Sequence, residues 1–202
     1  MIRIYGICLD SLPDSANELL TALPISIADP WQRQHPSLRE KNAKKASLAG
    51  VWLLWRAKSD ALLAYTADGK PFLQNFEGAI SITHTKTHAF CAILDERGEI
   101  GLDAESFGRI SPDRLQALSD RWFTEAEKEA FHQAQSEERF LEIWTRKEAL
   151  VKLTGDGMRA LHRTDTQDES LDIHYATYRL DSTIVSLAFP KNSIPPTEIL
   201  FL

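Results

Sequence analysis

Hydrophobic and polar positions divide the chain into segments of two different periods. Short apolar runs and alternating patterns predict strands at residues 2–9, 79–83, 89–94, 100–104, 171–180, 183–189 and 198–202. Helical spacing predicts helices at residues 37–59, 111–118, 124–135 and 140–152. The segment at residues 12–31 contains three prolines that interrupt any regular pattern. The chain therefore predicts a mixture of helices and strands.

Several local signals set the ends of these elements. Thr124 followed by Glu127 predicts a capping box, and Gly155 is a residue that ends the helix before it. Residues 68–71, Asp-Gly-Lys-Pro, predict a turn. Residues 48–55 are the most apolar stretch, but they are too short to span a bilayer, so they predict a buried helix.

The order of strand, long helix and strands occurs twice, first from Ile2 and again from Ile100. Residues 6–10 also resemble residues 100–103. We therefore expect an α+β fold of two similar α/β halves, residues 1–98 and 99–202, packed as a pseudo-dimer. Each half would place a long helix against a small, mostly antiparallel sheet.

Composition narrows the class of protein. The 202 residues have a formal net charge of -6, which argues against nucleic acid as a partner. Cys8 and Cys91 are too few for a disulfide framework, and both predict buried, reduced thiols. The N-terminal residues show no secretory signal, and no stretch predicts a membrane partner. We expect a soluble cytoplasmic protein.

Two acidic residues follow each other on one face of a predicted strand. Asp103 and Glu105 are two residues apart, so their side chains project to the same side. Neighbouring carboxylates repel each other unless a proton or a cation lies between them. Carboxylate oxygens are the ligands that magnesium and manganese prefer. A solvated strand end explains such a pair equally well when it is taken alone.

A predicted helix carries a second charged group. Glu148 and Lys152 are four residues apart and share one helix face, with Trp144 one turn earlier. An ordinary stabilising ion pair also explains this spacing, and Trp144 is expected in the core in either case. Under the functional interpretation, Glu148 adds a third carboxylate to the metal, and Lys147 and Lys152 supply positive charge for phosphates.

A third group lies earlier in the chain. Residues 69–71, Gly-Lys-Pro, precede a strand that ends in Thr83 and His84. A histidine beside hydroxyl groups can donate a hydrogen bond to a phosphate. A solvated histidine on a surface turn is the simpler alternative for this group alone.

In this order the three groups resemble the 4'-phosphopantetheinyl transferase family, in particular its surfactin-type branch, in which one chain contains two similar halves. The resemblance extends over roughly residues 41–157, and residues 122–127 are similar to the family's Phe-Ser/Thr-x-x-Glu element. It implies transfer of the phosphopantetheine arm of coenzyme A to a serine of an acyl or peptidyl carrier protein. The reaction would release 3',5'-ADP, as a holo-[acyl-carrier-protein] synthase type of phosphopantetheinyl transferase does.

The resemblance assigns roles to individual residues. Asp103, Glu105 and Glu148 match the metal-binding carboxylates, which implies Mg²⁺, with Mn²⁺ as an alternative. Lys152 matches the lysine near the coenzyme A pyrophosphate, and Lys147 lies beside the third carboxylate. Catalysis is therefore expected from Asp103, Glu148 and Lys152. The general base stays open between Glu148 and a hydroxide on the metal.

The remaining coenzyme A contacts would come from the first half. Lys70 matches the lysine near the nucleotide, and Thr83 and His84 match the pair near the 3'-phosphate. Lys44 or Lys45 would replace an arginine of the family, because residue 46 is alanine here. The resemblance places coenzyme A across the seam between the halves, so a monomer could complete the site. Basic residues that could meet an acidic carrier are Lys86, Arg109, Arg114 and Arg121.

Two other functions agree with parts of this pattern. A magnesium-dependent hydrolase of a nucleotide pyrophosphate would use the same carboxylates and lysine. A catalytically silent module could bind coenzyme A or a carrier without reaction. Metal-dependent product formation separates both enzymes from the silent module, and a mass increase of the carrier separates the transferase from the hydrolase.

Overall fold

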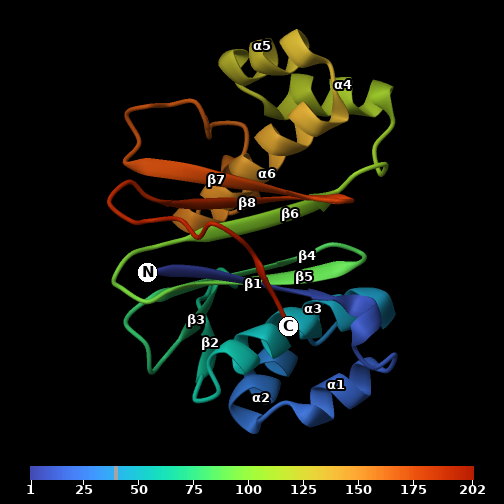
Figure 1. Cartoon of the computed structure of the whole chain (residues 1–202), viewed down its shortest axis with the longest axis vertical. Helices are drawn as coiled ribbons and strands as arrows, with labels where there is room; N and C mark the ends of the chain where they lie inside the picture. The colour runs from blue at the N-terminus through green and yellow to red at the C-terminus, as the bar shows by residue number, and fades with distance from the viewer. Residues whose placement is uncertain (39–40) are drawn as a thin grey trace. The chain divides into compact units, whose positions relative to one another are not determined.

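The computed structural model describes residues 1–38 and 41–202 and confirms the predicted α+β class (Figure 1). Contacts divide the chain into two compact units. The first unit contains Met1–Glu99 together with Ile194–Leu202, and the second contains Ile100–Ser193. The predicted division into residues 1–98 and 99–202 assigned the C-terminal segment to the second half, whereas its contacts group it with the first unit.

The first unit contains a four-stranded sheet in the order β4-β5-β1-β9. Its strands are β1 (Ile2–Cys8), β4 (Ala79–His84), β5 (His88–Leu94) and β9 (Leu200–Phe201). β5 pairs antiparallel with both β4 and β1, and β9 adds to β1 in parallel. A separate antiparallel pair is formed by β2 (Leu63–Tyr65) and β3 (Pro71–Leu73), and the predicted turn at residues 68–71 connects them.

Helix α3 (Lys41–Ala57) is the long helix of the first unit. Its later turns are apolar and buried, as the sequence predicts, and they pack on the sheet through the core cluster. The helix was predicted from Ser37, but residues 39–40 lie outside the described residues. A Cβ on Gly50 would lie 2.3 Å from Ile82 Cγ2, so glycine allows α3 to approach β4 closely.

Two further helices lie in the segment where the prolines interrupt any regular sequence pattern. Helix α1 (Ala16–Ala22) begins after Ser15, and α2 (Ile25–Gln34) begins after Pro24, while the 3-10 helix η1 spans Leu9–Ser11. Proline is tolerated at helix starts, where no N–H is needed, but Pro30 lies inside α2. Burial of Ile27 and Trp31 in the core accompanies the helix there.

The second unit contains a three-stranded antiparallel sheet in the order β6-β8-β7. Its strands are β6 (Gly101–Ser106), β7 (Ile173–Leu180) and β8 (Thr183–Pro190), and the last two form the predicted hairpin. Its helices are α4 (Pro112–Trp122), α5 (Glu125–Ala134), α6 (Glu137–Thr154) and the 3-10 helix η2 (Met158–Ala160).

The predicted signals at the helix ends are confirmed. Thr124 and Glu127 form a capping box at the start of α5. Gly155 adopts the left-handed conformation (φ 78°) that ends α6. Trp144 is only half-buried and packs at the margin of an aromatic cluster rather than inside the core. None of the described helices combines the length and the apolar character needed to cross a membrane.

Candidate active site

The second unit brings charged side chains from a strand and a helix together. On β6, Gly101, Asp103 and Glu105 share the face toward α6, because strand side chains alternate. A Cβ on Gly101 would lie 1.8 Å from the Ala149 carbonyl oxygen, so glycine allows α6 to cross directly over the strand. This close approach brings Glu148 and Lys152 of α6 to the carboxylates of β6.

Lys152 connects the helix to the strand. Its Nζ donates to Asp103 Oδ1 at 2.6 Å and to the Leu102 carbonyl oxygen at 3.1 Å. Asp103 is buried, whereas about one third of the Lys152 side chain (35 %) stays exposed. The ammonium group of Lys152 is therefore held beside the carboxylate and is still open to solvent on one side.

The other two carboxylates are also affected by their neighbours. Burial, and next the negative charge of Asp103, raise the pKa of Glu148 to about 8, although Lys152 lowers it and Glu105 raises it further. Burial and Asp103 likewise raise the pKa of Glu105, while Arg109 and Lys152 lower it. Glu105 Oε2 accepts a hydrogen bond from Arg109 Nη1 at 2.9 Å. Below about pH 8, Glu148 is therefore mostly protonated, and Lys152 and Arg109 face the carboxylates of Asp103 and Glu105.

The donor atoms of this group suit a hard divalent cation, because they are carboxylate oxygens under mutual repulsion. Within the described residues, however, no three carboxylate, histidine or cysteine side chains are arranged to hold a metal ion as they stand. Asp103 and Glu105 instead form ion pairs with Lys152 and Arg109. The chemistry of the donor set fits Mg²⁺ or Mn²⁺, and convergence on the ion would require side-chain rotation.

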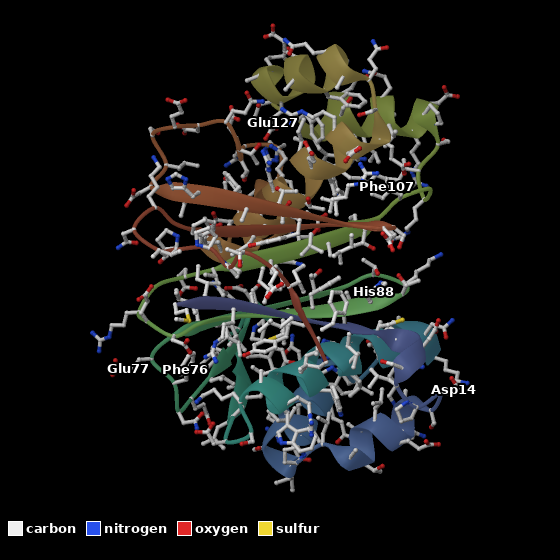
Figure 2. The ribbon with its side chains drawn as sticks, in the orientation of Figure 1. Asp14, Phe76, Glu77, His88, Phe107 and Glu127 are labelled. Carbon is white, nitrogen blue, oxygen red and sulfur yellow. The ribbon has the colours of Figure 1, made fainter. Side chains whose placement is uncertain are left out.

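Lys147 does not belong to this group, which corrects the prediction that it supplies charge to a phosphate. It is fully buried on a different face of α6, and its Nζ donates to Glu127 Oε2 at 2.7 Å. Glu127 is also fully buried, and Figure 2 labels it on α5, the helix that packs on α6. A cation with no exposed surface and a buried partner is not available to a ligand.

The predicted coenzyme A residues of the first unit lie on several of its elements. Thr83 and His84 end β4, where Thr83 is buried and His84 is exposed. Lys70, at the turn before β3, has its Nζ 2.5 Å from Glu99 Oε2. Lys44 Nζ donates to Asn17 Oδ1 at 3.2 Å, and Lys45 Nζ donates to the Leu12 carbonyl oxygen at 3.2 Å.

Two features of the site were not predicted from the sequence. Arg109 was considered only as a docking residue, although its spacing of four from Glu105 is the signal that would have indicated an ion pair. The contact of Thr145 Oγ1 with Ser186 Oγ, at 2.7 Å, joins α6 to β8 and has no signal in the sequence. Ser186 lies directly opposite Asp103 in the sheet.

Two comparisons relate the chain to known proteins. The family model described as the 4'-phosphopantetheinyl transferase superfamily matches residues 99–186. The 4'-phosphopantetheinyl transferase HetI of Nostoc sp. is 33% identical over 108 residues, which is 50% of this chain and 44% of HetI. The match thus spans less than half the length of that relative. Through residues 99–186, the chain is similar to the 4'-phosphopantetheinyl transferase superfamily.

Proposed function

We propose that this protein transfers the 4'-phosphopantetheine arm of coenzyme A to a serine of an acyl or peptidyl carrier protein, in the cytoplasm, and releases 3',5'-ADP. The observation that carries the proposal is the meeting of Asp103 and Glu105 on β6 with Glu148 and Lys152 on α6. This meeting falls inside the segment that matches the superfamily model. The transferase activity in the name of HetI supports the same reaction.

Asp103, Glu105 and Glu148 would hold a divalent cation, Mg²⁺ or Mn²⁺. When bound, such an ion neutralises charge on the pyrophosphate and stabilises the departing 3',5'-ADP. In its absence, Lys152 and Arg109 neutralise part of the carboxylate charge. Loading of the site would therefore release the Arg109 and Lys152 side chains from Glu105 and Asp103.

Lys152 would then contact the pyrophosphate of coenzyme A. Its ammonium is partly exposed and is held at the buried Asp103, so a short movement brings it to an anion above the site. Glu148 is the chain's own candidate for accepting the proton of the carrier serine. A carboxylate whose pKa is raised toward neutrality is a stronger base than an ordinary glutamate.

The nucleotide part of coenzyme A would be bound by residues of the first unit. Lys70 and His84 present cationic or hydrogen-bonding groups, and Thr83 ends the same strand as His84. We include Lys44 and Lys45 as phosphate contacts, since both lie on the first turns of α3. We also propose that the chain follows the surfactin-type organisation of two similar halves and acts as a monomer.

Intact-mass spectrometry of a purified apo-carrier tests this function. The carrier is incubated with the protein, coenzyme A and Mg²⁺, beside a reaction that contains EDTA. We expect the carrier to gain the mass of one phosphopantetheine group, and EDTA to abolish the gain. Free 3',5'-ADP should accumulate in step with the modified carrier.

The possible failures of this experiment have different meanings. Release of 3',5'-ADP without a mass gain, across several types of carrier, would indicate a hydrolase and contradict the transfer. Binding of coenzyme A without any product would indicate a silent module. Asp60→Asn is a suitable matched control for substitutions at Asp103, because Asp60 is an exposed aspartate of the first unit.

A further inference from the structure

A buried ion pair lies beside the candidate active site and takes no part in the chemistry proposed above. Lys147 of α6 and Glu127 of α5 are both fully buried, and their Nζ and Oε2 atoms are 2.7 Å apart. They lie on consecutive helices of the second unit that pack against each other. Since neither side chain reaches solvent, neither can bind coenzyme A or a carrier directly.

Further hydrogen bonds satisfy both charges. Glu127 Oε2 accepts from the Thr124 backbone N–H at 2.9 Å, and Oε1 accepts from the backbone N–H and the hydroxyl of Thr166, at 2.9 and 2.8 Å. Lys147 Nζ also donates to the Thr164 carbonyl oxygen. The pair thus connects three parts of the chain: the start of α5, the middle of α6 and the segment that follows α6.

A second contact holds the same segment. Gln167 Nε2 donates to the Ala126 carbonyl oxygen of α5 at 3.1 Å. Residues 164–167 are therefore attached to α5 by three donor groups on Thr166 and Gln167, and to α6 by Lys147. This attachment fixes the path of the chain between the end of α6 and β7.

Burial of this ion pair has a high free-energy cost compared with its contribution to stability. Taking two charges out of water carries a large desolvation cost, and apolar residues of similar volume often stabilise a protein as well or better. What an ion pair with several hydrogen bonds provides instead is a single allowed geometry. A requirement for orientation explains the arrangement better than a requirement for stability.

Orientation matters here because of the neighbouring residue. Lys147 and Glu148 are consecutive, so their side chains leave α6 about 100° apart. Fixing the direction of Lys147 therefore fixes the rotation of the helix that aims Glu148 and Lys152 at β6. On the strand side, the close approach of Gly101 to Ala149 leaves little room for the helix to adjust.

We propose that Glu127 and Lys147 are positioning residues, which hold α6 in the rotation that directs Glu148 and Lys152 toward Asp103. The inference deepens the proposed function and rests on it for the reaction that is measured. It assigns Glu127 no contact with substrate, metal or carrier. Its effects should therefore appear in turnover and in metal affinity, and not in the recognition of coenzyme A.

The test uses the full chain with Glu127→Leu and Lys147→Met combined, which replaces the pair by apolar groups. Ser119→Ala is the matched control, because it removes the hydrogen bond of another buried side chain of the second unit, from Ser119 Oγ to the Gln116 carbonyl oxygen within α4. Five quantities are measured: the Tm, the Kd for Mn²⁺, the kcat and the KM for coenzyme A, and amide hydrogen exchange. The kinetic assays are run at a temperature where every variant is folded.

We expect the double variant to unfold cooperatively, with kcat reduced about tenfold or more and Mn²⁺ affinity reduced to a similar extent. Its KM for coenzyme A should stay within about twofold of the wild-type value. Amide exchange should become faster at residues 146–153 and 164–167. Ser119→Ala should lower the Tm without these changes.

A double variant with wild-type kcat and Mn²⁺ affinity would overturn the inference, because the pair would then be only structural. If that variant does not fold, Thr166→Val replaces it, since this change removes one donor to Glu127 and keeps both charges. The same changes in smaller degree support the inference, and unchanged kcat and exchange overturn it. If the wild type transfers nothing, the proposed function fails, and exchange at residues 146–153 alone decides the positioning.

Discussion

The two long helices of this protein perform different tasks with similar geometry. α3 in the first unit and α6 in the second each pack against a small sheet, and each pair of elements meets closely at a glycine, Gly50 or Gly101. The buried residues of α3 are all apolar. α6 also buries Thr145 and Lys147 and holds Glu148 and Lys152 against β6.

The contact of α3 with its sheet only supports the fold, whereas the contact of α6 with β6 carries the charged groups of the proposed reaction. Apolar packing is tolerant, because volume and pattern matter more than any single atom. A contact between charged groups depends on distances of tenths of an ångström and on each partner being present. The first helix should therefore tolerate substitutions that the second does not, and the predictions below are ways to break or refine this contrast.

The largest effect should come from the charged contact. Asp103→Asn removes the buried carboxylate that Lys152 contacts at 2.6 Å, so we expect turnover in the carrier assay to fall about a thousandfold. The variant should stay folded, with a cooperative melt measured by circular dichroism. Most of the activity surviving at saturating Mg²⁺ would contradict a role of Asp103 in the site, and Asp60→Asn should behave as the wild type.

The apolar contact should show the opposite behaviour. Leu53→Ala in α3 leaves a cavity at a fully buried position, and we expect the free energy of unfolding to fall by about 3 kcal/mol. Turnover per folded molecule should be unchanged. Urea denaturation combined with the carrier assay at low temperature checks both statements, and a selective loss of kcat would show that α3 is more than a support.

The two glycines test how closely each helix approaches its sheet. Gly101→Ala would place a Cβ 1.8 Å from the Ala149 carbonyl oxygen and 2.7 Å from the Leu153 backbone nitrogen, so we expect a loss of about 2 kcal/mol or more. Gly50→Ala meets only the Ile82 side chain, which can rotate, and it gains about 1 kcal/mol of helix propensity. Equal losses in urea denaturation would contradict this ranking.

A further effect concerns the dependence of stability on pH. The pKa of Glu148 is about 8 in the folded protein, so between the ordinary glutamate value and pH 8 the folded state holds a proton that the unfolded state lacks. In EDTA, stability should therefore fall as pH rises from about 5 to about 8, by at most about 1.4 kcal/mol per unit. Glu148→Gln should remove this slope in thermal melts, while an unchanged slope would assign it to other groups.

Mn²⁺ binding should depend on pH in the opposite direction. The ion must replace the proton on Glu148, so its affinity should rise with pH and level off near pH 8. Titrations at pH 6, 7 and 8 measure this dependence.

Local patterns in the sequence predicted much of the fold. The β7–β8 hairpin, the capping box of Thr124 and Glu127 and the end of α6 at Gly155 follow from residues close together in the chain. The resemblance to the family, over residues 99–186, and the α+β class were also confirmed. The roles of Asp103, Glu105, Glu148 and Lys152 remain predictions, although the structure places the four side chains near one another.

What could not be predicted depends on contacts between distant residues. Lys147 was predicted to supply positive charge for phosphates because it is next to Glu148. Its partner Glu127, however, is twenty residues earlier in the sequence and on another helix. Helices α1 and α2 were not predicted, because prolines interrupt this segment of the sequence. The burial of Trp31 that accompanies α2 depends on tertiary contacts. Neither feature can be predicted from residues that lie within one helical turn of each other in the sequence.

The short strand β9 makes the first unit discontinuous in sequence. Leu200 and Phe201 cover the outer edge of β1. A Cβ on Gly6 would lie 3.1 Å from Phe201 Cε1 and from Ile199 Cγ2, so glycine leaves room for these side chains. A fragment cut at residue 99 would keep β1 but lose its pairing at Tyr5 and Gly6, which leaves N–H and C=O groups unpaired at that edge. Such an open edge recruits other chains, so the fragment should aggregate, and a peptide of residues 194–202 supplied separately should suppress the aggregation.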